Sequence, residues 1–226
     1  MKFIILGCGS SMGVPRTDGY FGNCDPNNKK NYRTRCSGLI QTKNQNILID
    51  TSPDLRQQLL RHKIKYINKV FYSHMHGDQT HGINDLRTFF INQKKPIDVY
   101  ADLATSRYLK HSFSYCFQNY SKEYPAILKL NKINKELLIN NNNQKIRIKP
   151  LAVKHGRINS ICYIINSKLA YISDVSEVYL KDFKYFKNLK YLIIDCLWFN
   201  PHPSHFNLEK SLDFIKKVKP KKAILT

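Results

Sequence analysis

Three histidines and one carboxylate lie within eight residues of the segment 72–82, and side chains of these types are common metal ligands. His74 and His76 alternate along the chain, so in an extended backbone both side chains point to the same side and can bind one metal ion. Asp78 continues this register, whereas His81 lies beyond it and is interpreted as a support for the ligands. An apolar run typical of a buried strand directly precedes the cluster. The segment therefore predicts a metal site at the end of a strand.

Further candidate ligands follow predicted strands later in the chain. His155 comes after a strand predicted over 146–153, and Asp174 comes after another over 169–173. Asp195 ends the next apolar strand, where a role in the site and a role as a turn or cap carboxylate both stay open. Functional groups at one end of several strands usually converge on one site. We therefore expect these side chains to complete the metal site.

The remaining four histidines fall into two groups. His202 and His205 lie in a proline-containing loop before a predicted helix and are further candidates for the site. His62 and His111 stand alone on predicted helices. A lone histidine is usually structural, so these two are interpreted as surface or core residues.

The order of the predicted elements indicates the fold class. Strands are predicted over 2–6, 37–42, 46–51, 66–73, 97–101, 146–153, 160–165, 169–173, 189–195 and 222–226. Helices are predicted over 53–62, 83–92, 103–118, 176–184 and 207–218. Residues 131–145 are interpreted as asparagine-rich turn and edge material. Two groups of strands with helices outside them predict a layered α/β domain with mixed sheets.

The composition is that of a folded globular protein. The 226 residues, of which 42% are hydrophobic, can bury a substantial core. No apolar stretch reaches the roughly 18 residues of a transmembrane helix, and the first apolar run is too short for a signal peptide. We expect a cytoplasmic protein with no membrane partner. The six cysteines form no CxxC pair, which favours reduced thiols over disulfides.

The formal net charge of +21 suggests an anionic partner, such as nucleic acid, a nucleotide or a phosphorylated metabolite. A general bias of composition is the alternative, because the lysines are spread along the chain. A glycine- and serine-rich loop at 7–16 could offer backbone N–H groups to an anion. Arg33 and Arg35 make the following polar segment basic, and both a solvated loop and a phosphate-facing loop stay open for it.

The cluster at 74–78, followed by His155 and Asp174 after later strands, resembles the metallo-β-lactamase superfamily over essentially the whole chain. The segments 6–16 and 202–206 resemble the branch that holds the phosphoribosyl 1,2-cyclic phosphate phosphodiesterase, a relative of the tRNA 3′-processing endonucleases. The resemblance implies a single α/β domain over 1–226, folded as a four-layer αββα sandwich. It also implies two divalent metal ions, Zn²⁺ or Mn²⁺.

The resemblance assigns a role to each candidate. The first metal ion would be bound by His74, His76 and His155. Asp174 would bridge the two ions, and Asp78 would bind the second and take part in catalysis. His205 matches a general acid that protonates the leaving oxygen. Two ions about 3.5–4 Å apart can supply hydroxide at neutral pH and hold a phosphodiester for in-line attack.

Three positions depart from the pattern of the family. Gln79 replaces a histidine, and its amide oxygen is a weaker and harder ligand, so we expect a loosely bound second ion or one such as Mn²⁺ or Mg²⁺. Relatives place another histidine after the strand that ends here at Thr226, so a truncated end or a missing ligand is expected. Only Cys24 remains of a cysteine cluster that binds a structural zinc ion in some members, so no such zinc is predicted.

The leading functional hypothesis is a metal-dependent phosphodiesterase that acts on a small cyclic or nucleotide phosphodiester. A nuclease acting on RNA or DNA is an alternative function that the basic charge favours. Whether the chain forms an oligomer stays open. A degraded, non-catalytic fold is the alternative from another class, favoured by Gln79 and the missing histidine. A β-lactamase or thioester hydrolase is disfavoured, because a neutral substrate leaves little for the basic loops and His205 to do.

Overall fold

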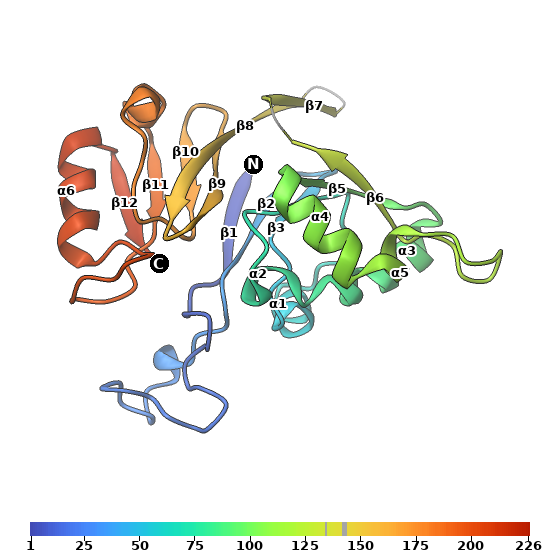
Figure 1. The fold of residues 1–226 in the computed structure, drawn as a ribbon, viewed down its shortest axis with the longest axis horizontal. Coiled ribbons are helices and arrows are strands. Elements are labelled where there is room, and N and C mark those ends of the chain that lie inside the picture. The colour runs from blue at the N-terminus through green and yellow to red at the C-terminus, as the bar shows by residue number, and fades with distance from the viewer. Residues whose placement is uncertain (134, 142–143) are drawn as a thin grey trace. The chain divides into compact units, whose positions relative to one another are not determined.

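Two six-stranded sheets organise the chain, one in each of two compact units, Met1–Lys132 and Ile133–Thr226 (Figure 1). The computed structural model describes residues 1–133, 135–141 and 144–226. Part of the asparagine-rich segment predicted as turn and edge material, residues 134, 142 and 143, lies outside the described residues. The α/β class and the two groups of strands are confirmed.

The sheet of the first unit follows the order of the chain. Its strands are β1 (Lys2–Gly7), β2 (Ser37–Gln41), β3 (Asn46–Ile49), β4 (Lys69–Phe71), β5 (Ile97–Ala101) and β6 (Leu128–Lys132). The first three strands pair antiparallel, and β3 to β6 pair parallel. Parallel neighbours end at the same edge of a sheet, so the loop after β4 lies at the edge where β3 also ends.

Short helices join the parallel strands of the first unit. They are α1 (Leu55–Arg61), α2 (Gly77–Thr80), α3 (Arg87–Gln93), α4 (Leu103–Ser112) and α5 (Ser114–Phe117), with the 3-10 helix η2 (Ile83–Leu86). A further 3-10 helix, η1 (Lys29–Asn31), lies between β1 and β2. Leu55, Leu86 and Leu109 are fully buried in one apolar cluster with strand residues such as Val70 and Val99. Burial of this apolar surface anchors the helices to the sheet and so fixes the loops between them.

The second unit builds a mixed sheet from the rest of the chain. Its strands are β7 (Leu137–Asn141), β8 (Gln144–His155), β9 (Ile158–Ile165), β10 (Leu169–Ile172), β11 (Tyr191–Ile194) and β12 (Lys222–Leu225). The strands from β7 to β10 pair antiparallel, whereas β10, β11 and β12 pair parallel. The ends of β10 and β11 therefore lie at one edge of this sheet.

The helix predicted over 176–184 is wrong. The structure has instead the 3-10 helix η3 (Leu180–Phe186), and the segment before it is extended. The backbone N–H of Ser176 donates to Lys154 on β8, and the N–H of Lys154 donates to Glu177. Since these hydrogen bonds tie the segment to a strand, tertiary pairing overrides its helical propensity.

The last helix is confirmed as α6 (Leu208–Val218). The side chain of Asn207 caps it by accepting the N–H of Lys210. Its buried face carries Phe214 and Val218, whereas Leu212 is 43% exposed. All six cysteines are free thiols, as expected. Among the described residues, no helix is long and apolar enough to cross a membrane.

Between β1 and β2 the chain runs out from the sheet of the first unit and returns (Figure 1). An ion pair anchors the returning part, because the guanidinium of Arg35 donates to Asp54 over 2.9 and 2.7 Å and the Arg35 N–H donates to the same carboxylate over 2.9 Å. These contacts hold the pKa of Asp54 below its ordinary value, the hydrogen bond from Arg35 contributing most. The carboxylate thus ties the loop to the start of α1.

We expect Asp54→Asn to lower the free energy of unfolding by about 1 kcal/mol at pH 7, a value that allows for partial exposure to solvent. Because the folded-state pKa of Asp54 is lowered, its stabilisation is present at neutral pH and disappears as the pH falls through that pKa, below about 4. Urea unfolding of both proteins between pH 3 and 8 measures the difference. Asp18→Asn is the control, since the Arg16–Asp18 pair is exposed and its loss should leave the midpoint unchanged. A deficit for Asp54→Asn that is equal at pH 3 and pH 7 would contradict the role of the ion pair.

Candidate metal centre and catalytic residues

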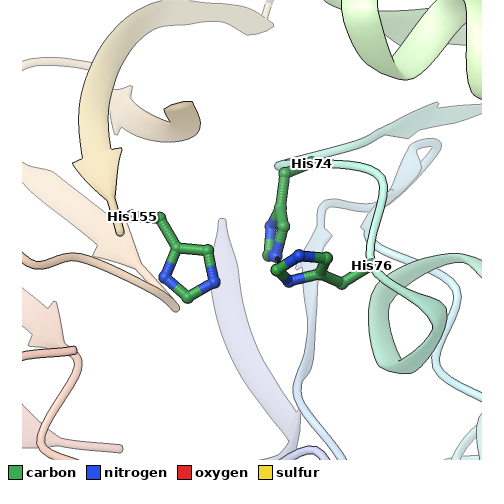
Figure 2. Close-up of side chains that lie close together, drawn as sticks. All are labelled: His74, His76 and His155. Carbon is green, nitrogen blue, oxygen red and sulfur yellow. Dashed lines mark hydrogen bonds between the residues drawn. The ribbon is translucent and has the colours of Figure 1, made fainter. Parts of the chain in front are cut away.

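The loop after β4 brings two of the predicted ligands together in the first unit. His74 is 1% exposed and His76 is exposed, and their ring atoms Nε2 and Nδ1 lie 2.9 Å apart (Figure 2). The side chain of Ser73 contacts Nδ1 of His74 at 3.0 Å. This contact at Nδ1 orients the ring so that Nε2 faces the neighbouring imidazole. The alternating spacing in the sequence thus predicts the pair correctly, although the segment is a loop and not a strand.

A buried carboxylate that the sequence analysis did not single out holds this loop in place. Asp50 follows β3, and its Oδ1 accepts the backbone N–H of Ser73 over 2.7 Å. It is fully buried and adopts a left-handed backbone conformation with φ of 62°. Such a conformation is unfavourable for a residue other than glycine and persists only where the surroundings stabilise it. The available signal was the one used for Asp195, a carboxylate directly after a buried strand.

Asp78 lies in the first turn of the short helix α2. The side-chain amide of the buried Gln79 donates to Oδ2 of Asp78 over 3.1 Å. The backbone carbonyl of Gln79 accepts the backbone N–H of Thr51 over 2.7 Å. Gln79 thus orients a predicted ligand, a role that its interpretation as a weak substitute ligand did not include.

His81 contacts a different set of groups from the other histidines of the cluster. Its Nε2 lies 3.0 Å from the hydroxyl of Tyr108, and its ring packs edge-on against Phe113 at 5.6 Å between centroids. The ring also lies under Gly77, where an added Cβ would come within 3.1 Å of it. His81 therefore packs against the backbone of the ligand loop, which agrees with its predicted supporting role.

The second unit brings together three more of the predicted residues. His155 ends β8, Asp174 follows β10, and His205 lies in the loop before α6. One potential ligand atom from each of them lies within 4.8 Å of the others. Nδ1 of His155 donates to the backbone carbonyl of Ser204 over 2.7 Å. This leaves Nε2 of the same ring, which Figure 2 shows, as the nitrogen that could bind a metal ion. Nδ1 of His205 lies 3.8 Å from Oδ1 of Asp174.

Asp195 pairs directly with His205. Its Oδ2 lies 2.8 Å from Nδ1 of His205 and accepts the backbone N–H of Val175 over 2.9 Å. The carboxylate is 3% exposed, and this burial raises its pKa to about 7, against the opposing effect of the His205 contact. Of the two roles left open for Asp195, the structure favours a role in the site. The pairing orients His205 with Nδ1 toward the carboxylate and Nε2 away from it.

The neighbouring His202 has a structural role in the same loop. Its Nδ1 accepts the backbone N–H of Ser204 over 3.3 Å and lies 3.2 Å from the hydroxyl of that residue. Its ring stands 5.1 Å from that of His205, centroid to centroid, and its pKa is lowered by burial and by this neighbour. His62 and His111 are exposed, so of the two interpretations left open for them the structure shows the surface one.

The donor set of each unit fits a divalent metal ion. Imidazole nitrogens and carboxylate oxygens are the usual ligands of Zn²⁺ and Mn²⁺. In the second unit the two predicted ligands, His155 and Asp174, have ligand atoms within 4.8 Å of each other, and the ring of His155 is already held by Ser204. In the first unit Ser73 and Gln79 hold two predicted ligands in the same way. Such supporting contacts are typical of metal sites.

The Beta-lactamase superfamily domain matches residues 45–226, which is most of the chain. The chain belongs to this superfamily. A solved diphosphatase from the PhnP family is similar over 99% of this chain and 84% of its own, with 30% sequence identity and a TM-score of 0.86. The recognised family and its branch are thereby confirmed, together with the metallo-β-lactamase fold.

Two curated relatives carry different names. An octanoyltransferase of Porphyromonas gingivalis is 30% identical over 227 aligned residues, which cover 100% of this chain and 45% of the relative. A ribonuclease Z of Prochlorococcus marinus is 29% identical over 130 residues, which cover 54% of this chain and 39% of the relative. The chain therefore spans less than half the length of either curated relative.

We expect the purified protein to hold up to two divalent ions per chain, and His76→Ala and Asp174→Ala each to reduce this number, because each change removes a ligand. Elemental analysis after gel filtration in metal-free buffer measures the content. His111→Ala is the control, since this histidine is exposed on α4 and is not a predicted ligand. Retention of both ions by His76→Ala and Asp174→Ala would contradict the assignment.

Proposed function

We propose that this chain is a metal-dependent hydrolase whose substrate is a phosphodiester. The observation that carries the proposal is the pairing of His205 with the buried Asp195 beside Asp174, a predicted metal ligand. A metal centre alone suits many hydrolases, whereas a histidine held by a buried carboxylate suits the protonation of a poor leaving group. The likeness to a diphosphatase supports chemistry at a phosphorus centre.

In this proposal each unit contributes predicted metal ligands. The residues that would hold the ions are His74, His76, Asp78, His155 and Asp174. Divalent ions at such a site lower the pKa of bound water and neutralise the charge of a phosphate group. The contacts of Ser73 and Ser204 keep two of the imidazoles in the orientation that binding requires.

His205 is the proposed general acid. Asp195 accepts the Nδ1 proton, so the second proton of the imidazolium is held at Nε2, which is directed away from the carboxylate. That proton would pass to the leaving oxygen as the bond from phosphorus to oxygen breaks, and the imidazole would become neutral. Asp195 stabilises the charged form before transfer and fixes the ring, so it acts as a positioning residue.

The size of the substrate separates two proposals. A small cyclic or nucleotide phosphodiester is favoured by the likeness over 99% of this chain to a diphosphatase. An RNA strand is favoured by the net charge of +21 and by the ribonuclease Z relative. A non-catalytic fold is disfavoured, because a structural role does not require a nearly fully buried carboxylate paired with a histidine in a loop.

We expect the metal-loaded protein to hydrolyse bis(p-nitrophenyl) phosphate. Removal of a metal ligand in His76→Ala should abolish turnover, and loss of the proton donor in His205→Ala should lower kcat by about 10²–10⁴-fold. Release of p-nitrophenol, followed at 400 nm with a chelator-treated sample alongside, measures the rate. His111→Ala, an exposed histidine on α4, is the control and should retain full activity. Equal rates with and without chelator would refute the proposal.

Asp195→Asn should lower kcat by about 10²-fold or more with little change in KM, because Asn cannot balance the charge of the imidazolium. The readout is the division of the effect between kcat and KM, together with metal content, which should stay at the wild-type level. A loss of metal equal to the loss of rate would show that Asp195 acts only on the ligand set. Thermal unfolding of the variant separates both results from a failure to fold.

A further inference from the structure

The loop between β11 and α6 in the second unit presents two adjacent aromatic side chains to solvent. Trp198 is 57% exposed and Phe199 is 82% exposed, whereas Phe206 in the same loop is buried. Single exposed apolar residues are common on protein surfaces, but neighbouring large rings form a patch that is typical of a binding site. The proposed general acid His205 lies in the same loop.

The backbone that carries the two rings is fixed. The N–H of Leu208, the first residue of α6, donates to the carbonyl of Trp198 over 2.9 Å. The side-chain amide of Asn207 donates to the carbonyl of Phe199 over 3.1 Å, and the same side chain caps α6. The rings therefore stand on a main chain that is held by the start of a helix, which reduces the entropy cost of binding a ligand.

A row of ring contacts connects Trp198 with the proposed catalytic groups of the second unit. The ring of Trp198 packs edge-on against His202 at 5.6 Å between centroids, and His202 lies 5.1 Å from His205. The ring of His205 also contacts that of His155, a predicted metal ligand, at 4.7 Å. The row thus leads from a metal ligand through the proposed general acid to the exposed indole.

This row relates the two rings to the leaving group of the substrate. The leaving oxygen must come within hydrogen-bonding distance of Nε2 of His205 to receive its proton. In one direction the ring contacts of His205 lead to the metal ligand His155, where the phosphate group would lie, and in the other they lead to Trp198. A leaving group that extends in the second direction meets an aromatic surface. Such a surface binds planar groups, and every nucleobase offers a face for stacking.

We propose that Trp198 and Phe199 form a stacking site for the nucleobase of the leaving group. The inference rests on the proposed function and narrows it to phosphodiesters whose leaving group is a nucleoside. Hydrolysis consumes one water molecule, whose oxygen becomes bonded to phosphorus as the bond from phosphorus to the nucleoside oxygen breaks. The proton at Nε2 of His205 passes to that oxygen, so the products are a free nucleoside and a phosphate monoester.

Fluorescence tests the stacking site without any need for turnover, because Trp198 is the only tryptophan among the 226 residues. We expect 2′-deoxyadenosine to quench the tryptophan fluorescence of the metal-loaded protein with a saturable dependence on concentration. The sugar 2-deoxyribose, which has no base, should leave the fluorescence unchanged. In Phe199→Ala the Kd for deoxyadenosine should rise about fivefold or more, because one stacking surface is lost.

Leu180→Ala is the matched control for the loss of an exposed apolar side chain in the second unit. Leu180 is 85% exposed and begins η3, which precedes the start of β11, whereas the aromatic loop follows the end of that strand. Its variant should retain the wild-type Kd. Quenching that is absent or does not saturate, or a Kd that rises equally in Leu180→Ala and Phe199→Ala, would overturn the stacking site.

Hydrolysis of a dinucleotide tests the same site during catalysis. The substrates are the phosphodiester of two deoxyadenosines and its analogue in which the leaving nucleoside lacks the base; the product released without phosphate identifies the leaving side. We expect kcat/KM to be about tenfold or more higher for the complete dinucleotide. Trp198→Ala and Phe199→Ala should each reduce this preference, and Trp198→Phe, which keeps an aromatic face, should retain most of it.

The outcomes separate this inference from the proposed function. Equal kcat/KM values for the dinucleotide and its analogue would overturn the assignment of the leaving group while hydrolysis itself stands. Absence of all hydrolysis, together with saturable quenching that Phe199→Ala weakens, would support the base site and refute the proposed function. A dimer in gel filtration that Trp198→Ala and Phe199→Ala both dissociate would show that the two rings join copies of the chain, and would overturn the stacking site.

Discussion

A carboxylate that is almost fully buried must be surrounded by donors, and Asp195 meets this constraint by joining four segments of the second unit. It accepts from Val175 after β10 and from His205 in the loop before α6. The backbone carbonyl of Asp195 accepts a hydrogen bond from the hydroxyl of Ser211 on α6 over 2.6 Å. Because an unpaired buried charge would cost several kcal/mol, these contacts fix the end of β11 relative to the loop and the helix. The position of the proposed general acid follows from the same constraint.

In the first unit a buried carboxylate likewise organises a loop, at the end of β3. Asp50 is buried, has a left-handed backbone and accepts the N–H of Ser73, which starts the loop of the ligand pair. Ser73 then contacts His74, so one carboxylate sets the path of the chain and, through a neighbour, the orientation of an imidazole. In each unit a carboxylate after a parallel strand organises the functional loop. The carboxyl ends of parallel strands are the edge at which such groups meet.

The structure shows which basic residues of the first unit are paired with a carboxylate and which line a cavity. In the sequence, Arg33 and Arg35 fit two interpretations, a solvated loop or a phosphate-facing loop. Arg35 is neutralised by Asp54, whereas Arg33 lines a cavity with Arg61, a residue far along the chain that no motif had indicated. Net charge alone does not distinguish these cases, because pairing with a carboxylate depends on which side chains the fold brings together.

The sequence by itself determined the two groups of strands and the closeness of His74 to His76, because alternation and spacing are local properties of the chain. It also indicated His155, Asp174 and His205 through their places after predicted strands and before a helix. Only the tertiary structure decided that Asp195 holds His205, that Gln79 orients Asp78, and that Ser176 and Glu177 pair with Lys154 on β8. These outcomes depend on hydrogen bonds between residues that the fold brings together and on burial, neither of which a local pattern encodes.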